Sequence, residues 1–446
     1  MKTIKTPLTG LARKLLAIPV VALLFAPLCS FAQTDNTAAV QKLLTAGDVT
    51  LPANTTYYVT GLSVTHALNM NGSTFIMTGA SNGCIKLQAV GASVTNGTVK
   101  GTWDNTTAAN AYGALGIRIL ADNCSITKMT VTGVPSYGIL CGAFNKPVIT
   151  NCTVSNTGYI GFYYDSEANT TGGTFSNNVV DRSMLPAATA QQGCVMIRAS
   201  TAATTFVTSG WTIANNTLKM PYMPTNWTVE CMETRWISNS TISGNTFSQG
   251  SIGCSVVACT NVTLVSNKYS GQSLEAIEFA DCNACATKND IVTSGVGVGI
   301  LLDGSKGCVN TTIHKATISG TTGDCVHAYL GTQTVNIDSC TLTASKGARG
   351  MNLQKTTGVI IKNSTFNGNS AGTLAVLLDT CPGNLTITGG AVSNFTSCVV
   401  SIYSATSGPI NNVIMSGVKV TNVPKALQTT LSNGATLGAN VNVVSQ

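Results

Sequence analysis

Short apolar segments with an alternating pattern, separated by Asn, Gly, Ser and Thr, follow one another along most of the chain. A turn-type residue, a small residue and a β-branched or aromatic residue recur about every two dozen positions. Such alternation is typical of short strands, and a period of roughly 20–50 residues indicates a solenoid. The copies begin at Cys152, Asn178, Asn216, Asn245, Asn267, Asn289, Ala316, Cys340, Ser364 and Gly390.

The spacing between copies is irregular in one region: the longest spacings, 38 and 29 residues, are consecutive, and Glu230 lies within the second. The additional residues fall at 181–192, 200–210 and 219–226. Insertions in solenoids form loops on one face, which is often the binding face. Trp227 follows the last insertion, and we expect it to bind substrate, because sugar rings stack on aromatic faces.

The two ends of the chain differ from the repeat. Residues 36–45 have a helical pattern and precede a Tyr57-Tyr58-Val59 strand, so residues 33–62 are predicted to cap the solenoid. Residues 63–425 are assigned to the coils and residues 426–446 to a C-terminal tail or cap.

The first 32 residues have the features of a signal peptide. Lys2, Lys5, Arg13 and Lys14 precede an apolar stretch at 15–28, and Ser30-Phe31-Ala32 offers a cleavage site. No later apolar stretch is long enough to span a membrane. We therefore expect a bacterial protein that is secreted or periplasmic and is not inserted into the membrane.

The composition narrows the class of protein further. Charged residues make up 9% of the chain, and β-branched residues are abundant, which excludes a disordered protein. The net charge of +7 falls to about +3 without the four basic residues of the signal peptide. The sequence has no basic run typical of nucleic-acid binding.

Fifteen of the 16 cysteines lie beyond the signal peptide. Export permits disulfides, but most of these cysteines are interpreted as small buried side chains that fill stacked interior positions. Cys282 and Cys285 have the spacing of a metal knuckle, yet no second Cys or His pair accompanies them. No metal or cofactor is predicted.

The N-terminal helix, the coil length and the Asn-rich turns together resemble the right-handed parallel β-helix proteins of the pectate-lyase-like superfamily. The resemblance covers most of the chain and implies an all-β, single-stranded right-handed parallel β-helix with about a dozen coils. That superfamily includes polysaccharide lyases, glycoside hydrolases, epimerases, phage depolymerases and non-catalytic surface proteins, so the fold alone selects no activity.

One strand can be aligned from coil to coil, and its alternation directs the middle residue of each triplet outward. The aligned middle residues are Arg118, Leu140, Tyr163, Met196, Glu230, Ser255, Glu278, Leu301, His327 and Asn352. A second outward column, two residues later, contains Asp165, Arg198, Met232, Ala280, Asp303 and Tyr329.

These columns contain many of the few charged residues, and we expect the active site there. Glu230 and Glu278, two coils apart, are predicted to be the acid and base that cleave a glycosidic bond, with His327 as a further catalytic residue. The predicted substrate-binding residues are Tyr163, Asp165, Arg198, Trp227, Asp303 and Asn352. The predicted partner is a poly- or oligosaccharide.

Two other functions fit the same columns. A polysaccharide lyase acting on a uronate-containing glycan would use Tyr163, Arg198 or His327 as its base or as its charge-neutralising group. A non-catalytic surface or adhesin β-helix would use the exposed face for binding. No Asp-rich calcium cluster or compact epimerase motif accompanies these residues.

A shorter segment, Ile277-Glu278-Phe279-Ala280-Asp281-Cys282-Asn283-Ala284-Cys285, resembles a stretch of the inulin fructotransferase family. The resemblance implies that Glu278 is the catalytic glutamate of an enzyme that forms difructose anhydrides and assembles as a homotrimer. The companion Asp of that family, expected ten or eleven residues earlier, is absent here, because Asn267 and Lys268 occupy those positions.

Overall fold

The computed structural model describes residues 34–79, 82–105, 113–186, 192–199, 207–223, 229–293, 295–404 and 408–444. The predicted signal peptide lies outside these residues, as does Trp227. The chain divides into a unit at Met1–Thr34 and a unit at Asp35–Gln446, and the fold described below is that of the second unit.

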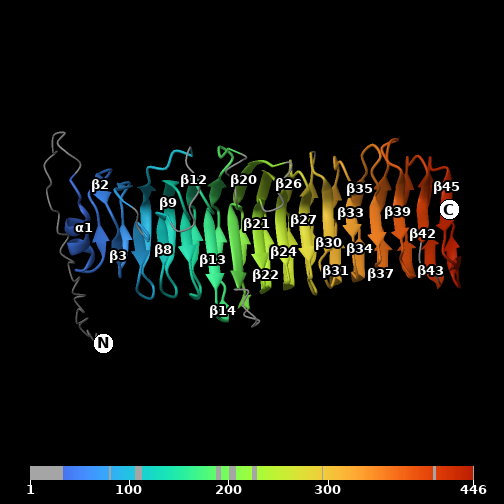
Figure 1. Cartoon of the computed structure of the whole chain (residues 1–446), viewed down its shortest axis with the longest axis horizontal. Helices are drawn as coiled ribbons and strands as arrows, with labels where there is room; N and C mark the ends of the chain where they lie inside the picture. Colours follow the sequence, from blue (N-terminus) through green and yellow to red (C-terminus); the bar gives the residue numbers. More distant parts are fainter. Residues whose placement is uncertain are drawn as a thin grey trace, which may run out of the picture. The chain divides into compact units, whose positions relative to one another are not determined.

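The second unit is a right-handed parallel β-helix of about 14 turns, which confirms the fold predicted from the repeat. Its coils follow one another in sequence order along the stack (Figure 1). Each strand pairs in parallel with its equivalent one coil earlier, as β21, β24 and β27 do. Equivalent residues of adjacent coils therefore lie about 4.8 Å apart.

Three rows of strands run along the stack. The row that carries the candidate site contains fifteen strands: β3 (Leu62–Val64), β6 (Ile85–Leu87), β8 (Ile117–Ile119), β10 (Ile139–Cys141), β13 (Phe162–Ser166), β17 (Val195–Ala199), β21 (Glu230–Arg235), β24 (Ile252–Val257), β27 (Glu275–Ala280), β30 (Val298–Asp303), β33 (Val326–Ala328), β36 (Met351–Gln354), β39 (Leu374–Asp379), β42 (Cys398–Ser404) and β45 (Lys425–Leu431).

The second row contains β1 (Val49–Thr50), β4 (Ala67–Asn69), β11 (Val148–Thr150), β15 (Thr174–Ser176), β19 (Thr212–Ala214), β22 (Ile237–Ser243), β25 (Thr260–Val265), β28 (Ala286–Lys288), β31 (Val309–His314), β34 (Gln333–Asp338), β37 (Thr357–Lys362), β40 (Gly383–Thr388), β43 (Gly408–Ser416) and β47 (Val441–Val443). β46 (Ala435–Leu437) also pairs with β43, and the short strands β14 (Thr170–Thr171) and β18 (Thr208–Ser209) lie beside this row.

The third row contains β2 (Thr56–Val59), β5 (Thr74–Met77), β12 (Thr153–Thr157), β16 (Val179–Asp181), β20 (Thr217–Tyr222), β23 (Thr246–Gly250), β26 (Lys268–Ser270), β29 (Ile291–Val292), β32 (Thr317–Ile318), β35 (Thr341–Thr343), β38 (Thr365–Asn367), β41 (Ala391–Ser393) and β44 (Lys419–Thr421). The long strands β7 (Ser93–Lys100) and β9 (Ser125–Val134) belong to both the second and third rows.

The predicted helix is present as α1 (Thr37–Leu44), at the N-terminal end of the stack (Figure 1). Val40 and Leu44 are buried against the first coil. The Gln41 side chain donates to the Ser63 carbonyl at 2.9 Å and accepts from the Ser63 amide at 2.8 Å. These contacts satisfy backbone groups of the edge strand β3, which would otherwise remain open to pairing. Within the described residues, no helix is long and apolar enough to cross a membrane.

The repeated Asn residues form an interior ladder at the turn before the third row. Each side-chain amide donates to the next coil: Asn178 to Asn216 at 3.1 Å, Asn216 to Asn245 at 2.9 Å, and Asn245 to Asn267 at 3.0 Å. Asn267 donates to Asp290 at 3.0 Å. The ladder satisfies buried polar groups at this turn, which explains why Asn recurs there.

The repeat alignment predicted from sequence is wrong by one residue at Asn289, because Asp290 occupies the ladder position. The sequence repeat places Asn289 in this column, but Ile291 pairs with Lys268 and Thr317, so Asp290 is the residue aligned with Asn267. Asn289 instead adopts φ +55°, the left-handed conformation that Asn tolerates better than most residues. Adjacent Asn and Asp residues made the two alignments equally plausible from sequence.

The interior is filled by stacked apolar side chains, including the aromatic pairs Phe162–Phe175 and Phe247–Tyr269, whose ring centroids are 4.8 Å apart. All fifteen cysteines from Cys84 to Cys398 are buried and unpaired. The interpretation of the cysteines as small interior side chains is thus confirmed. Residues 425–443 add β45, β46 and β47 to the stack.

Candidate active site

The first strand row carries an outward column in which nine of the ten predicted triplets have the expected register. Pairing continues from Leu140 through Tyr163 to Met196, and from Ser255 through Glu278 to Leu301. His327 and Asn352 then follow. The remaining triplet is wrong: Met196 pairs with Glu233, and Glu233 pairs with Ser255. Glu233, and not Glu230, therefore lies in the column.

The misplacement of Glu230 has a physical cause in the triplet itself. Val229-Glu230-Cys231 has the apolar, polar, apolar pattern expected of an outward residue between two inward ones. In the correct triplet, Met232-Glu233-Thr234, the inward residue after the glutamate is polar. Thr234 is fully buried and donates its hydroxyl to the Ser255 carbonyl at 3.4 Å. The second column is corrected as well, because Met232 is buried in the core and Arg235 takes the outward position.

Four glutamates lie at the corners of a rectangle on this face. Glu233 and Glu278 flank Ser255 in the outward column, and Glu230 and Glu275 flank Ile252 in a column three residues earlier. Each pair is two coils apart, which corresponds to about 9.6 Å between strand positions. We call these four residues the glutamate rectangle.

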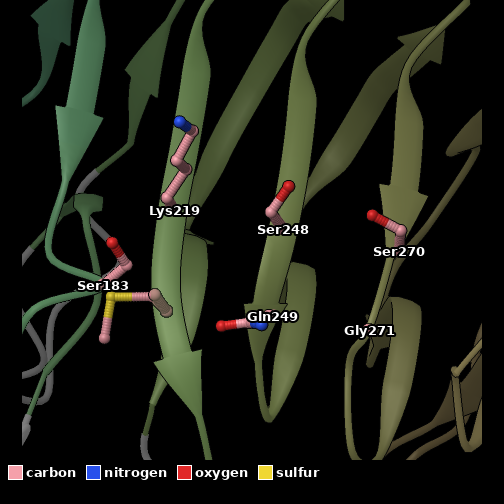
Figure 2. Close-up of a pocket in the computed structure, with 7 residues that line it drawn as sticks. Ser183, Lys219, Ser248, Gln249, Ser270 and Gly271 are labelled. Atoms are coloured by element: carbon pink, nitrogen blue, oxygen red, sulfur yellow. The ribbon is translucent and has the colours of Figure 1, made fainter.

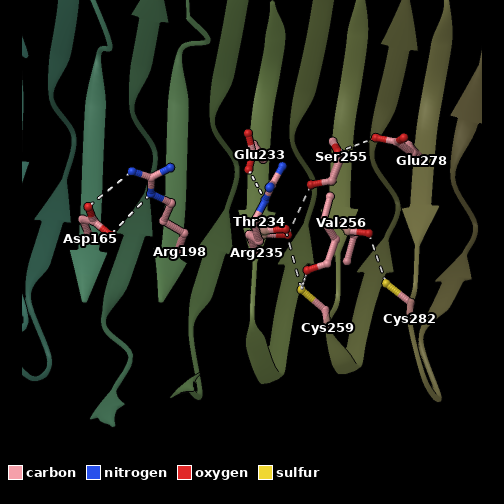
Figure 3. Close-up of polar contacts among 11 residues, drawn as sticks. Asp165, Arg198, Glu233, Thr234, Arg235, Ser255, Val256, Cys259, Glu278 and Cys282 are labelled. Carbon is pink, nitrogen blue, oxygen red and sulfur yellow. Dashed lines mark hydrogen bonds and ion pairs between the residues drawn. The ribbon is translucent and has the colours of Figure 1, made fainter. Parts of the chain in front are cut away.

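Glu233 forms an ion pair with Arg235. The Arg235 Nε lies 2.7 Å from the Glu233 Oε1, and Glu233 is buried. The Arg235 guanidinium also lies over the ring of Trp236, 5.5 Å from its centroid. Figure 3 shows Glu233 and Arg235 between the Asp165–Arg198 contact on one side and the Ser255–Glu278 hydrogen bond on the other.

Glu278 has a different environment. The Ser255 hydroxyl donates to the Glu278 Oε2 at 2.5 Å (Figure 3). Burial raises the pKa of Glu278, and the Ser255 hydrogen bond opposes this change because it favours the carboxylate. Two carboxyls of one column are thus placed in contrasting electrostatic environments.

The second column of the rectangle is more strongly perturbed. Burial, followed by the nearby Glu233, raises the pKa of Glu230 to about 8. Burial, followed by Glu278 and Asp303, raises the pKa of Glu275 to about 8. Glu275 is 6% exposed, and its Oε2 has no hydrogen-bond partner among the described residues.

Tyr163, Asp165 and Arg198 were predicted together and do lie together. The Tyr163 hydroxyl donates to the Asp165 Oδ2 at 2.6 Å. The Arg198 Nε lies 3.4 Å from the Asp165 Oδ1, and Figure 3 shows this contact between Asp165 and Arg198. The Arg198 guanidinium is 5.2 Å from the Tyr163 ring centroid. Tyr137 stacks on Tyr163 with centroids 5.1 Å apart. This cluster begins one coil before Met196 and two coils before Glu233.

The other predicted residues lie on the C-terminal side of the rectangle. Asp303 pairs with Ala280 on the coil after Glu278. His327 is two coils beyond Glu278, and its Nε2 is 3.2 Å from the Asn352 Nδ2. Burial lowers the pKa of His327. His327 is therefore in the predicted column but separated from Glu278 by Leu301.

An open pocket of about 390 Å³ lies on the third strand row, away from these carboxyls. Ser183, Lys219, Met220, Ser248, Gln249, Ser270 and Gly271 line it. Figure 2 shows Lys219, Ser248 and Ser270 on successive strands. The Lys219 Nζ lies 3.8 Å from the Asp181 Oδ2, so its charge is already paired. The residues that line the pocket offer few groups that could act as an acid, a base or a nucleophile.

No three His, Cys, Asp or Glu side chains among the described residues are arranged to hold a metal ion. The Cys282 thiol contacts the Val256 carbonyl at 3.1 Å, and the Cys285 thiol contacts the Cys259 carbonyl at 3.7 Å. Both sulfurs thus face the buried backbone of the preceding coil, and Cys282-x-x-Cys285 is an interior feature.

Sequence reasoning missed Glu233, Glu275 and Arg235. A signal for them exists, because Glu230-Cys231-Met232-Glu233 and Glu275-Ala276-Ile277-Glu278 are two Glu-x-x-Glu motifs 45 residues apart. That separation equals two coils of 22 and 23 residues, as the pairing of Glu233, Ser255 and Glu278 confirms. Searching for one motif repeated at whole-coil spacing would have aligned β21 correctly.

Comparison with solved structures identifies the same fold in proteins of several kinds. The N-terminal fragment of bacteriophage Phi29 gene product 12 aligns with a TM-score of 0.52 and 14% identity, covering 91% of this chain and 72% of that one. An Azotobacter vinelandii mannuronan C-5 epimerase A-module aligns with a TM-score of 0.41 and 13% identity, covering 93% and 96%.

A DFA-IIIase from Arthrobacter chlorophenolicus A6 aligns with a TM-score of 0.37 and 8% identity, covering 69% of this chain and 84% of that one. No family model and no curated protein sequence matches the chain. At 14% identity, the likeness to the bacteriophage protein concerns the fold alone.

Proposed function

We propose that this protein is an exported enzyme that cleaves glycosidic bonds of a poly- or oligosaccharide, with Glu233 and Glu278 as its base and acid. The observation that carries the proposal is the position of these two glutamates in one outward column, on either side of Ser255. Their strand positions are about 9.6 Å apart, near the upper end of the roughly 6.5–9.5 Å carboxyl separation of inverting glycosidases. Side-chain tilt can shorten this separation.

The two carboxyls have environments suited to opposite roles. Burial raises the pKa of Glu278, which favours a protonated carboxyl that can donate to the leaving oxygen. Glu233, paired with the Arg235 guanidinium, is assigned to accept a proton from the attacking water. Bond cleavage then leaves one product with the proton from Glu278 and the other with the hydroxyl of that water.

The lyase alternative receives less support from the same face. A lyase base must accept a proton, but the Tyr163 hydroxyl donates to Asp165, and burial raises the Tyr163 pKa. Arg198, the group expected to neutralise a uronate, is paired with Asp165. His327 lies two coils from the nearest member of the rectangle.

The decisive experiment is incubation of the purified protein with neutral and acidic glycans, with three product readouts. A hydrolase releases reducing ends, a lyase product absorbs ultraviolet light through its new double bond, and a fructotransferase gives a non-reducing cyclic disaccharide. We expect reducing ends, and their loss in Glu278→Gln. Absence of product from every glycan would favour the non-catalytic surface protein.

Export is the second part of the proposal and rests on the N-terminal segment alone. Cleavage after Ala32 would yield a mature chain starting at Gln33. N-terminal sequencing of the protein recovered from periplasm and medium tests this directly, and an intact residue 1 in cytoplasmic material would contradict it.

A further inference from the structure

The glutamate rectangle lies in a region with no unpaired cation among the described strands. On β17, β21, β24, β27 and β30, the cationic side chains are Arg198 and Arg235. Arg198 is paired with Asp165, and Arg235 is paired with Glu233 at 2.7 Å. Asp303 adds a fifth carboxyl beside the rectangle. A carboxylate on a ligand would lose water here and find no unpaired cation on these strands to compensate its charge.

Glu275 provides independent evidence that the rectangle receives a ligand. Its side chain is buried, and its Oε2 has no hydrogen-bond partner among the described residues. A buried polar atom without a partner is costly, and the cost is relieved when a ligand supplies the missing partner. Because the pKa of Glu275 is raised to about 8, its carboxyl carries a proton at neutral pH and can donate it to a ligand oxygen.

Apolar side chains flank the rectangle on both sides along the same columns. Ile160, Tyr163 and Met196 form an outward apolar cluster on the N-terminal side, and Tyr137 packs against it. Val298 and Leu301, both partly exposed, occupy the two columns on the C-terminal side. Sugar rings bind such surfaces through their C–H faces, while their hydroxyls reach polar groups between them.

We infer that the rectangle binds an uncharged glycan whose chain lies along the stack, with rings over the apolar flanks and hydroxyls at the glutamates. This inference rests on the proposed function, which states that a glycosidic bond is cleaved. It adds the class of substrate that carries this bond. It excludes uronate units at the cleavage position. The carboxyls of Glu230 and Glu275 serve as hydroxyl-binding groups on one side of the bond.

The test separates binding from cleavage. Binding of Glu278→Gln is measured by affinity electrophoresis against neutral hexose polymers (β-glucan, mannan, inulin and starch), against polygalacturonate and alginate, and against each bound neutral polymer after oxidation at C6. The oxidised polymer differs from its parent by carboxylates alone. Cleavage by the unmodified enzyme is measured on the same panel. We expect binding of at least one neutral polymer and about 100-fold weaker binding of its oxidised form, because a carboxylate that is desolvated without a cationic partner costs several kcal/mol.

The possible outcomes are distinguishable. Binding of a neutral polymer with no cleavage by the unmodified enzyme supports the substrate class and defeats the proposed catalysis. Cleavage of uronans, or equal binding of native and oxidised polymer, overturns the substrate class while leaving glycosidic cleavage intact. Failure to bind any neutral polymer also overturns the inference.

Two variants of Glu275 test its assigned contact. Glu275→Ala removes the donor and should weaken binding of the neutral polymer about 10-fold, the effect expected for one hydrogen bond in a buried site. Glu275→Gln keeps a donor of similar size and should retain most of the affinity. The exposed Glu167 supplies a matched control, because Glu167→Gln removes a carboxyl outside the site. Equal affinities of Glu275→Ala and Glu167→Gln, with both variants folded, would contradict the contact.

Discussion

Glu233 and Glu278 lie in one outward column on either side of Ser255, yet each carboxyl is held by a different neighbour. Arg235 pairs with Glu233 at 2.7 Å, and Ser255 donates to Glu278 at 2.5 Å. One neighbour is a cation and the other is a neutral hydroxyl. The same backbone repeat therefore supplies two chemically distinct carboxyls at a fixed separation.

The first prediction concerns removal of either carboxyl. Glu278→Gln and Glu233→Gln should each lower kcat by roughly 10²–10⁴-fold, the usual contribution of a general acid or base. Thermal unfolding should change little in Glu278→Gln, because this side chain is partly exposed on the outward face. Glu230→Gln should retain more activity than Glu233→Gln, since Glu230 lies outside the column. The reverse order of these two variants would contradict the register.

A second prediction concerns stereochemistry. A separation of two coils leaves room for a water between the base and the sugar, which predicts inversion at the anomeric carbon. Proton NMR of the first product formed, recorded before mutarotation, measures the anomer. Retention of configuration would instead require a nucleophile close to Glu278, for which Glu275 and Asp303 are the nearby carboxyls.

The strand row was predictable because its inward residues are apolar in nearly every coil. Ile277 and Phe279 around Glu278 are typical, and the alternation there fixes the register without any structure. The same rule failed at β21, because the inward Thr234 is polar and its hydroxyl is satisfied by a backbone carbonyl of the next coil. Hydrophobic pattern alone does not identify an inward residue whose hydrogen bond is made across coils.

The environment of each carboxyl was less accessible from sequence than its position. Neither the Arg235–Glu233 ion pair nor the burial of Glu275 follows from the pattern of apolar and polar residues. Alternation would direct residues three apart to opposite faces, yet Glu275 lies close enough to Glu278 for their charges to interact. The repeated Glu-x-x-Glu motif therefore gives the alignment of the coils, whereas the contacts of each carboxyl come from the structure.

A third prediction uses the hydrogen bond of Ser255. That bond lowers the pKa of Glu278 by favouring its carboxylate, so Ser255→Ala should raise the pKa. If protonated Glu278 is the acid, the alkaline limb of the kcat/KM profile should move to higher pH. Ser255→Thr keeps the hydroxyl and should leave the limb near its original position. An alkaline limb that is identical in all three proteins would assign it to another group.

The cysteines provide a fourth prediction. Burial raises the pKa of Cys84 and of Cys325 to about 12, and all fifteen thiols are unpaired. Because thiolate is the reactive form, a thiol reagent should modify fewer than one cysteine per folded molecule, and fifteen in denaturant. A reducing agent should leave the unfolding temperature unchanged. A fall in that temperature on reduction would indicate disulfides.

The last prediction concerns Asp290 at the end of the Asn ladder. Burial raises its pKa to about 6 from an unfolded value of 3.8. The folded state therefore holds this proton more tightly, and its contribution to stability is complete below pH 4 and lost as pH rises through about 6. At pH 8 the buried charge costs roughly 2–3 kcal/mol, so Asp290→Asn should raise the free energy of unfolding by up to that amount.

Denaturant unfolding of both proteins at pH 4 and pH 8 measures this effect. The gain of Asp290→Asn should be present at pH 8 and small at pH 4, where Asp290 is mostly protonated in the folded protein. Asn245→Asp offers the opposite change in the same ladder: it removes the amide that donates to Asn267 and to the Ile213 carbonyl at 3.0 Å. It should destabilise the protein at both pH values, and more at pH 8. A gain for Asp290→Asn that is equal at the two pH values would mean that the buried charge is not its cause.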